Sequence, residues 1–365
     1  MIDPDRFARR GRGAVSTRAG RFEPRQLESV DDGWGTLAEA LADPLARRGP
    51  RTTITPEHPK TIIRSNDSPD VGFDRSINPY QGCEHGCIYC YARPTHTYLG
   101  LGAGLDFETK LFSKPDAASL LRRELSKPGY EPKTIVLGTN TDCYQPAERA
   151  LRITRGLLEV LEETGHPIGV ITKSRGVVRD GDVLARMAKR GLARVAVSVT
   201  TLDPALSRTL EPRAAPPSGR LDAIRALSEA GVPVMAMVAP IIPGVTDAEI
   251  EGILQAVAEA GARSAGRILL RLPQEVGGLF EEWLAEHRPL RARHVLDLVR
   301  QCRDGALSSS AFGTRMRGTG PYADLIHRRF EVAARRHGLD GPLPALDATQ
   351  FRAPVLSGGQ LRLFG

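Results

Sequence analysis

The sequence predicts an α/β fold, specifically a partial (β/α)6 barrel of the TIM type, from two observations. Short, continuous apolar runs rich in Val and Ile alternate with amphipathic segments between residues 133 and 273. Apolar runs of this kind are typical of parallel strands covered by helices. Counting from a first strand near residues 75–80 gives about six strand–helix units, too few to close an eight-stranded barrel. We therefore expect a barrel that is open along one side, where a large substrate can enter.

The individual elements follow from the apolar runs and their boundaries. Later strands are predicted at residues 133–140, 167–174, 193–201, 232–244 and 267–273. The helices between them are predicted at residues 116–127, 146–165, 181–191, 218–231 and 246–261. Pro146 is expected to begin the helix that Gly165 ends, and Gly191 is expected to end the next helix. Ser218 is expected to cap a helix, and Thr246 with Glu249 to form a capping box.

Composition divides the chain into four parts. Residues 1–57 are poor in hydrophobic residues and rich in Arg, Gly and Pro, which predicts a basic N-terminal arm. A short helix over residues 36–48 is expected to dock this arm. Its arginine-rich stretch at 9–22 fits either a solvated tail or a nucleic-acid-binding arm. The remaining parts are the barrel core at 58–275, a helical C-terminal extension at 276–340 and an irregular tail at 341–365.

Charge and hydropathy narrow the class of protein. Lys and Arg number 50 against 43 Asp and Glu, a net charge of +7 that favours anionic partners such as nucleic acid, although a generic solvated surface fits it too. There is no apolar run of about 18 residues, so no membrane contact is predicted. The first residues lack the apolar core of a secretory signal. Clustered thiols without a disulfide framework indicate a reducing compartment, and we expect a cytoplasmic protein.

Three of the five cysteines fall within eight residues, at Cys83, Cys87 and Cys90. The adjacent glycines at 82 and 86 let the backbone curl, so that three thiolates can face one point. Soft thiolates at this spacing select zinc or an iron–sulfur cluster. A structural zinc site needs four ligands, and only His85 and His96 are candidates for the fourth. Three thiolates fit better with a 4Fe–4S cluster that keeps one iron open to another ligand.

The cysteine array, with Tyr89 just before its last cysteine, resembles the signature of radical S-adenosylmethionine (SAM) enzymes. Further landmarks are similar to the spore-photoproduct-lyase-like branch: Tyr-Ala-Arg-Pro after the cysteines, and segments at 138–142, 171–174, 198–201 and 238–244. The resemblance covers roughly residues 58 to 275. It implies a 4Fe–4S cluster in the loop at 83–90 and SAM as cofactor. It also implies a reductase, flavodoxin or ferredoxin as electron donor.

Candidate SAM-binding residues come from two sources. In parallel barrels functional side chains lie at the carboxyl ends of strands, a rule that selects the polar residues following the second, third and fourth strands. The resemblance adds an aromatic residue near the adenine and a segment that lines it. Glu211 and Arg213, which follow the fourth strand, are also assigned to SAM binding, although an exposed ion pair would explain them equally well. The candidates are Tyr89, Thr139, Asn140, Thr141, Lys173, Ser198, Glu211, Arg213, Ala239 and Pro240.

Two further residues are candidate catalytic groups. Tyr91 matches the tyrosine that spore photoproduct lyases have directly after the last cluster cysteine, where it takes part in radical transfer; simple packing is the alternative. Those lyases also use a hydrogen-donating cysteine near the end of the second strand, where this chain has Thr139. Cys143, four residues further on, is either a displaced donor or a buried thiol that packs as a small hydrophobe. The resemblance therefore does not imply that this chain carries out the lyase's repair reaction.

These expectations predict a cytosolic radical SAM enzyme that forms a 5′-deoxyadenosyl radical and abstracts hydrogen from a substrate. Nucleic acid, either DNA or RNA with a lesion or modified base, is the candidate substrate class. The loop at 312–322 interleaves Arg315 and Arg317 with Phe312 and Tyr322, which fits base stacking or a loop packed over the barrel mouth. The alternative function is a zinc- or cluster-stabilised nucleic-acid-binding protein without catalytic turnover.

Overall fold

The computed structural model describes residues 11–16, 21–22 and 51–355, and its centre is a seven-stranded sheet in the order β10-β9-β8-β7-β6-β3-β2. All neighbouring pairs from β3 to β10 are parallel, and only β2 is antiparallel to its neighbour. Within the described residues the edge strands β2 and β10 do not pair, so the barrel is open, as predicted. The strands are β2 (Arg64–Ser65), β3 (Arg75–Ile77), β6 (Ile135–Leu137), β7 (Ile168–Thr172), β8 (Ala193–Ser198), β9 (Val234–Ile241) and β10 (Ser264–Leu269).

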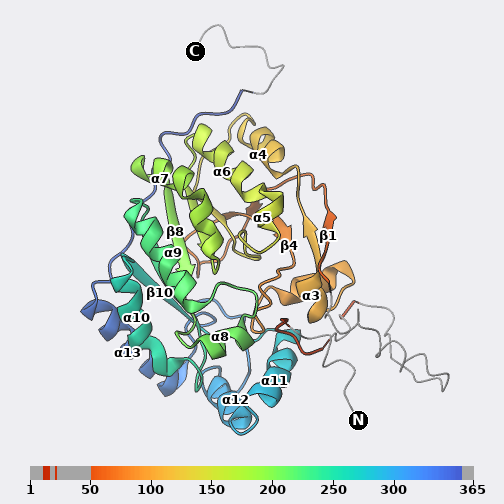
Figure 1. Cartoon of the computed structure of the whole chain (residues 1–365), viewed down its shortest axis with the longest axis vertical. Helices are drawn as coiled ribbons and strands as arrows, with labels where there is room; N and C mark the ends of the chain where they lie inside the picture. The colour runs from red at the N-terminus through yellow and green to blue at the C-terminus, as the bar shows by residue number, and fades with distance from the viewer. Residues whose placement is uncertain (1–10, 17–20, 23–50, 356–365) are drawn as a thin grey trace, which may run out of the picture.

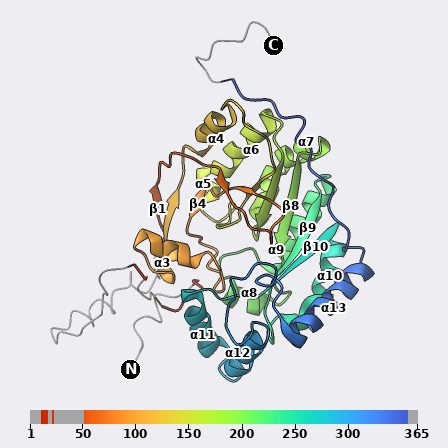
Figure 2. The ribbon, with the colours of Figure 1, turned by 180° about the vertical axis from the view of Figure 1, so that it is seen from behind.

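Helices follow one another around the outside of these strands (Figures 1 and 2). Their apolar faces and the strands enclose a single large core of fully buried aliphatic side chains, including Leu157, Val195 and Ile253. The helices of this layer are α4 (Ala117–Leu125), α5 (Glu148–Leu151), α6 (Ile153–Glu163), α7 (Gly181–Lys189), α9 (Pro217–Glu229) and α10 (Ile250–Glu259), with 3-10 turns η3 (Arg175–Asp180) and η4 (Asp247–Glu249).

A second, three-stranded sheet lies beside the barrel in the order β1-β5-β4. Its strands are β1 (Thr53–Pro56), β5 (Lys110–Ser113) and β4 (Tyr80–Gln81), and β4 leads directly into the cysteine loop. The short elements η2 (Arg93–Leu99) and α3 (Leu105–Thr109) connect the cysteine loop back to β5. The sequence did not predict this sheet, because runs of two to four residues carry no usable periodicity.

Local capping differs from the prediction at three places. Arg152, with φ of 51°, separates α5 from α6, so the single helix predicted at 146–165 is wrong. The cap at Ser218 is also wrong, because α9 begins one residue earlier and has no side-chain cap. The Glu249 carboxylate does not form a capping box; it accepts hydrogen bonds from the Thr201 hydroxyl (2.6 Å) and the Leu202 N–H (2.7 Å). Glu249 thereby stabilises the loop that follows β8.

The chain after residue 275 is mostly helical and closes the lower side of the molecule in Figure 1. Trp283 is fully buried there and donates its indole N–H to the Thr209 carbonyl (3.0 Å), which ties the extension to the segment after β8. The helices of the extension are α11 (Glu275–His287), α12 (Ala292–Gln301) and α13 (Gly320–Arg336), and Thr209 belongs to α8 (Pro204–Leu210), which follows β8. The helix predicted at 36–48 lies outside the described residues.

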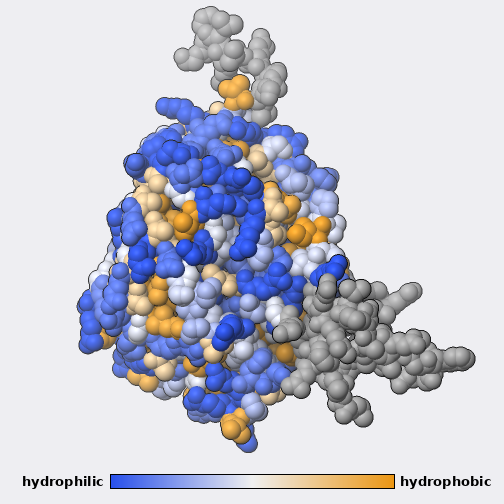
Figure 3. Space-filling model, viewed as in Figure 1, coloured by the Kyte–Doolittle hydropathy of each residue, from blue (hydrophilic) through white to orange (hydrophobic). Residues whose placement is uncertain are grey.

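The surface seen in Figure 3 is mainly hydrophilic, with small apolar patches that are separate from one another. Scattered apolar residues of this kind are normal on folded proteins. Among the described residues, no helix is both long enough and apolar enough to cross a bilayer.

Candidate functional site

The cysteine loop is held in place mainly by one buried arginine. Arg93 is fully buried and its guanidinium donates to the carbonyls of Cys87 (2.9 Å), Gly86 (3.1 Å), Ala103 (3.1 Å) and Gly104 (3.0 Å). Carbonyl oxygens that point inward would otherwise be left unsatisfied in the interior. Arg93 therefore fixes the backbone on which the second cysteine is mounted.

A buried carboxylate completes this arrangement and joins it to the N-terminal segment. Glu108 forms an ion pair with Arg93 (2.6 Å) and accepts hydrogen bonds from the backbone N–H groups of Gly13 (3.0 Å) and Ala14 (2.8 Å). Arg12 donates to the Glu108 carbonyl (2.8 Å). The described part of the arm, residues 11–16, thus packs directly against the cysteine loop.

Gly13 has no room for a side chain, which gives a test of this packing. A Cβ there would lie 1.8 Å from the Gly86 carbonyl oxygen. We expect Gly13→Ala to displace the segment, to lower the free energy of unfolding by about 1–3 kcal/mol and to reduce the iron bound after anaerobic reconstitution. Gly181→Ala is the control, because no atom lies within 4 Å of a Cβ there. Equal iron content and stability in both variants would contradict the assigned role of the segment.

A second buried side chain positions the start of the loop. Gln145 is fully buried; it accepts a hydrogen bond from the Glu84 N–H (2.8 Å) and donates one to the Gly82 carbonyl (3.2 Å). The glycines at 82 and 86 have φ of 74° and 67°, as the predicted curl of the loop requires. Two distant parts of the chain therefore determine the shape of this short loop.

The three thiols line one cavity of about 420 Å³ at the carboxyl ends of the parallel strands. Among the described residues, no three His, Cys, Asp or Glu side chains converge so as to hold one metal ion. A zinc site requires such convergence, whereas each thiolate of an iron–sulfur cluster binds a different iron. Burial raises the pKa of Cys83 and raises that of Cys87 to about 12. Such thiols ionise when a metal coordinates them. Three thiols on one cavity, each able to bind a different iron, are a donor set that fits a cluster.

Only one of the two histidines considered as a fourth ligand lines the cavity. The His96 Nε2 atom lies 2.8 Å from the Lys110 carbonyl, in the small sheet, and His96 does not line the cavity. His85 does line the cavity, and its Nδ1 atom lies 3.3 Å from the Asp142 carboxylate. Because a metal-binding histidine often has a carboxylate on its other ring nitrogen, His85 stays a candidate for a fourth ligand.

Most of the predicted SAM-binding residues share this cavity with the cysteines. They reach it from β6, β7, β8, β9 and the cysteine loop, as the strand-end rule predicts. Glu211 and Arg213 are the two candidates that do not line it. The lining candidates are Tyr89, Thr139, Asn140, Thr141, Lys173, Ser198, Ala239 and Pro240.

Glu211 lies behind Tyr89 and holds it in place. Its carboxylate accepts hydrogen bonds from the Tyr89 hydroxyl and the Thr200 hydroxyl (2.8 Å), and forms an ion pair with the fully buried Arg220. Burial alone would raise the pKa of Glu211, but the charges of Arg220 and Lys173 outweigh it and lower the pKa to about 2. Glu211 is therefore a permanently ionised positioning group.

Arg213 points away from the cavity. Its guanidinium pairs with the Glu84 carboxylate (3.0 Å), and its backbone N–H donates to the His85 carbonyl (3.2 Å). It therefore holds the outer side of the cysteine loop.

Lys173 stands at the cysteine end of the cavity. Its ammonium lies 5.9 Å from the centroid of the Tyr89 ring, and its backbone N–H donates to the Asp142 carboxylate (2.7 Å). Burial alone would raise the pKa of Asp142, but His85 and the backbone N–H groups of Lys173 and Tyr144 bring it down to about 2. Asp142 is thus an ionised anchor for the strand end, and no hydrogen bond or ion pair joins the Lys173 ammonium to another residue that the structure describes.

Asn78 organises the loop after β6 and was missed by sequence reasoning. Its side-chain oxygen accepts hydrogen bonds from the N–H groups of Asn140 (2.9 Å) and Thr141 (3.4 Å), and its amide donates to the Thr139 hydroxyl (3.2 Å). Asn78 stands just before the cysteine loop in the sequence, in the segment Ile-Asn-Pro-Tyr. This position next to the cysteine loop is the sequence signal that could have indicated a role for Asn78 at the site.

Tyr91 lies at the mouth of the cavity, with 46% of its surface exposed. Its hydroxyl donates to the Thr139 carbonyl, and the Arg271 guanidinium lies 4.9 Å from the centroid of its ring. Arg271 lines the cavity but was not predicted, because it follows β10 within an apolar run. Tyr91 is therefore close to the candidate cofactor residues and accessible to a substrate.

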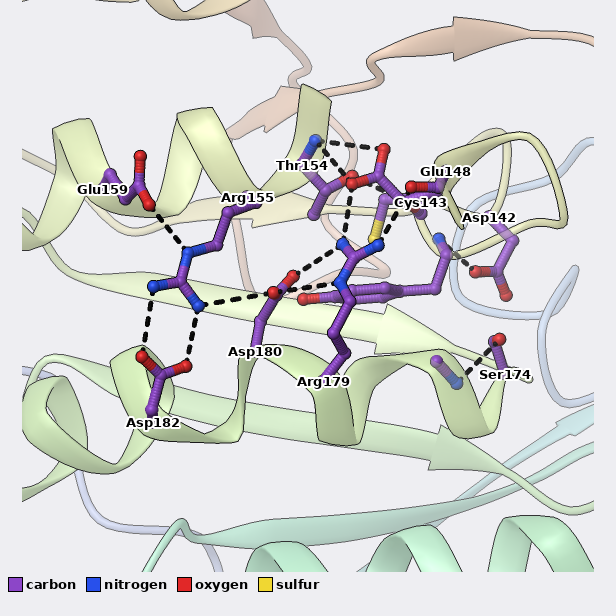
Figure 4. Close-up of polar contacts among 12 residues, drawn as sticks. Asp142, Cys143, Glu148, Thr154, Arg155, Glu159, Ser174, Arg179, Asp180 and Asp182 are labelled. Carbon is purple, nitrogen blue, oxygen red and sulfur yellow. Dashed lines mark hydrogen bonds and ion pairs between the residues drawn. The ribbon is translucent and has the colours of Figure 1, made fainter. Parts of the chain in front are cut away.

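Cys143 lies in the hydrophobic core and does not line the cavity. Its carbonyl accepts a hydrogen bond from the Thr154 hydroxyl (2.7 Å), and the neighbouring Glu148 accepts from the Thr154 N–H and from Arg179 (2.9 Å). Figure 4 shows this network joining the segment after Asp142 to α6 and η3. The structure thus favours the second reading of Cys143, a buried thiol.

Alkylation distinguishes the two readings of Cys143. The thiolate is the reactive form, and burial raises the pKa of Cys143 well above its ordinary value. We expect iodoacetamide to leave Cys143 unmodified in the native protein and to modify it after unfolding, as measured by peptide mass spectrometry. Cys302, which is also fully buried, is the control. Native-state modification of Cys143 but not of Cys302 would restore it as a hydrogen-donor candidate.

Comparison with known proteins agrees with this site. The radical SAM superfamily model matches residues 77–257. An uncharacterised protein of Mycobacterium tuberculosis is 37% identical over 231 residues, covering 63% of this chain and 68% of the relative. An uncharacterised protein of Methanocaldococcus jannaschii is 28% identical over 173 residues, covering 47% of this chain and 62% of the relative.

Among solved structures, the fold is similar to that of spore photoproduct lyase. The complex of that enzyme with dinucleoside spore photoproduct superposes with a TM-score of 0.56 at 18% identity, covering 79% of this chain and 81% of the lyase. A lyase variant with bound AdoMet and the same ligand gives a TM-score of 0.52 at 18% identity, covering 78% of this chain and 77% of the lyase. At this identity the likeness concerns the fold. Together, the matched core, the open barrel and the cysteine loop at its mouth show that the chain belongs to the radical SAM superfamily.

Proposed function

We propose that this chain is a radical SAM enzyme that cleaves SAM reductively and abstracts hydrogen from a nucleic-acid substrate. The observation that carries the proposal is a single cavity lined by three cysteines, the uncommitted ammonium of Lys173 and the strand-end residues of an open barrel. When bound, a 4Fe–4S cluster and SAM would together supply a 5′-deoxyadenosyl radical. The chain's own residues supply binding, orientation and exclusion of water.

The cavity offers distinct surfaces for the parts of SAM. The Lys173 ammonium and the Ser198 hydroxyl are suited to a carboxylate, because charge-assisted hydrogen bonds to carboxylates are strong. Tyr89, whose hydroxyl is fixed by Glu211, and the segment at Ala239 and Pro240 offer flat and apolar surfaces for the adenine. An electron donor such as a flavodoxin, ferredoxin or reductase is required by this proposal.

The substrate class is supported by fold and charge. Spore photoproduct lyase, whose fold is similar, has been solved with a dinucleoside ligand. This chain has a net charge of +7, which favours an anionic partner. The resemblance to the lyases implies that Thr139 falls at the place of their donor cysteine, and Cys143 is buried, so we propose a reaction that needs no thiol donor at this position.

The test is production of 5′-deoxyadenosine. Protein reconstituted anaerobically with iron and sulfide is incubated with SAM and dithionite, and the products are measured by liquid chromatography and mass spectrometry. We expect methionine and 5′-deoxyadenosine. A protein that loads iron but yields neither product, or that binds one zinc ion and remains colourless, would favour a binding protein without turnover.

Lys173→Met tests the assignment of the carboxylate site. Because a hydrogen bond to a charged group contributes about 1.5–3 kcal/mol, we expect the SAM concentration for half-maximal cleavage to rise roughly tenfold to a hundredfold. Lys189→Met removes an exposed lysine of α7 and is the control. An unchanged SAM requirement in the Lys173 variant would assign the carboxylate to another residue.

A further inference from the structure

Arg271 is a cation in the cavity that no other described residue pairs with. It follows β10, lines the cavity and is partly buried. Its guanidinium lies 4.9 Å from the centroid of the Tyr91 ring, and no hydrogen bond or ion pair joins it to another described residue. A guanidinium carries five donors in a fixed plane, so most of the binding capacity of Arg271 remains unused.

The other arginines around the cavity are already committed to the protein itself. Arg315 pairs with Asp70 (2.5 Å) across the open side of the barrel, between the loop before β3 and the loop after α12. Arg303 donates to the carbonyls of Leu269 (2.9 Å) and Leu270 (2.7 Å) at the end of β10. These two side chains hold the walls together, which leaves Arg271 as the guanidinium available to a ligand.

The surroundings of Arg271 favour an incoming anion. Burial lowers its pKa, the charge of Arg315 lowers it further, and Tyr91 and Asp70 act in the opposite direction without compensating. A partly desolvated cation without a counter-ion is stabilised when an anion occupies the site. Asp70 is engaged by Arg315 and by the Gly313 N–H (2.7 Å), so it does not serve as that counter-ion.

Arg271 and Lys173 contact different residues of the cavity lining. The Lys173 ammonium lies beside Tyr89 and acts electrostatically on Cys87, whereas Arg271 lies beside Tyr91 and acts on Arg315 and Asp70. One cation thus lies next to Tyr89, and the other lies next to Tyr91 and the pair of Asp70 and Arg315. If SAM takes the first position, the second remains for the substrate.

The walls near Arg271 suit a nucleotide. Phe73, Met237 and Met316 provide apolar and aromatic surface within the cavity, and Tyr91 presents a half-exposed ring at its mouth. Phe312 is outside the lining and 58% exposed, and the guanidinium of the lining residue Arg315 lies 4.6 Å from the centroid of its ring. Aromatic rings beside arginines are what nucleobases stack on, and the planar guanidinium fork matches phosphate oxygens.

We propose that Arg271, backed by the Tyr91 ring, is the phosphate-binding residue of a substrate subsite that takes a nucleotide unit. This rests on the proposed function and specifies its substrate, either a free nucleotide or a nucleotide within a strand. The phosphate is bound beside Arg271, and its base lies against the apolar walls between the cysteine end and the open side.

Binding to thymidylate probes tests this subsite. Reconstituted protein is titrated into fluorescein-labelled oligothymidylate of ten nucleotides, and thymidine monophosphate, thymidine and glutarate are used as competitors. We expect thymidine monophosphate to compete better than thymidine or glutarate. Arg271→Gln is expected to weaken oligothymidylate or thymidine monophosphate binding by about tenfold or more, and Arg271→Lys to weaken it less, because the charge remains but the fork is lost. Arg225→Gln, at an exposed position of α9 outside the cavity, is the control and is expected to change binding by no more than about twofold.

Each result bears on the proposal. Weaker binding of thymidine monophosphate, of oligothymidylate or of both by the Arg271 variants supports the subsite. The probe that is affected shows whether the phosphate belongs to a free nucleotide or to a strand. Binding of neither probe to the wild-type protein, equal weakening by Arg225→Gln, equal competition by glutarate, or a loss confined to SAM would overturn it. Unfolding midpoints of all variants identify any that fail to fold, and Arg271→Lys is then decisive. Failure of the proposed function is separate, since it appears as an absence of 5′-deoxyadenosine from the wild-type protein.

Discussion

Replacing Cys87 by alanine is expected to abolish SAM cleavage while leaving the fold intact. Cys87 contributes a thiol to the cavity, but the loop itself is held through its backbone carbonyl by Arg93. Alanine keeps that carbonyl, so the loop retains its shape and loses one of three cluster ligands. The measurement is 5′-deoxyadenosine formed in the presence of SAM and dithionite, together with the iron content after reconstitution.

Cys302→Ala is the matched control for this experiment. Cys302 is fully buried in the core and does not line the cavity, so its loss is expected to leave iron content and SAM cleavage close to wild type. Continued production of 5′-deoxyadenosine by the Cys87 variant would refute the assignment of that thiol as a cluster ligand.

Replacing Arg93 by methionine is expected to be the most destabilising single change around the loop. Methionine fills similar space but leaves four backbone carbonyls without their donor and the buried Glu108 without its ion pair. Removing one partner of a buried pair typically lowers the free energy of unfolding by 3–5 kcal/mol. We therefore expect a large decrease in the urea midpoint and failure to retain iron.

The comparison for Arg93 is Arg186→Met. Arg186 pairs with Glu162 (2.6 Å) on the surface of α7, and its side chain is 52% exposed. Surface pairs contribute about 0–1 kcal/mol, so this change is expected to be nearly neutral. Similar stability losses in the two variants would show that Arg93 is not the principal support of the loop.

The fold was predictable from sequence to the extent that its strands are apolar and its helices amphipathic. Strands β6 and β7 are buried at nearly every position, and this leaves continuous runs of Val, Ile and Leu that a reader can recognise. The small sheet was missed because β4 has only two residues and its formation depends on pairing with β5, which is distant in the sequence. A predicted capping box was wrong where a tertiary contact competed for the capping side chain. The Glu249 carboxylate accepts a hydrogen bond from the Thr201 hydroxyl and does not cap its own helix.

The candidate site was predictable where a strand end or a motif marked it. Lys173 and Ser198 follow strands, and the three cysteines form a compact motif, so their shared cavity could be expected. The supports of the loop were not predictable, because Gln145 and Glu108 act through hydrogen bonds to residues distant in sequence. Glu211 was expected to contact SAM but lies one layer further out, where it fixes Tyr89. The position of a polar residue in the sequence indicates that it lies near the site. Packing decides whether its side chain contacts the ligand or supports a residue that does.

We propose that the thiolates of Cys83, Cys87 and Cys90 hold a 4Fe–4S cluster with one iron open to SAM. Electron paramagnetic resonance of the reduced, reconstituted protein, recorded with and without SAM, is the decisive measurement. We expect about four iron and four sulfide per chain and a cluster spectrum that changes when SAM is added. A protein with one zinc ion, or a cluster spectrum that SAM leaves unchanged, would contradict it.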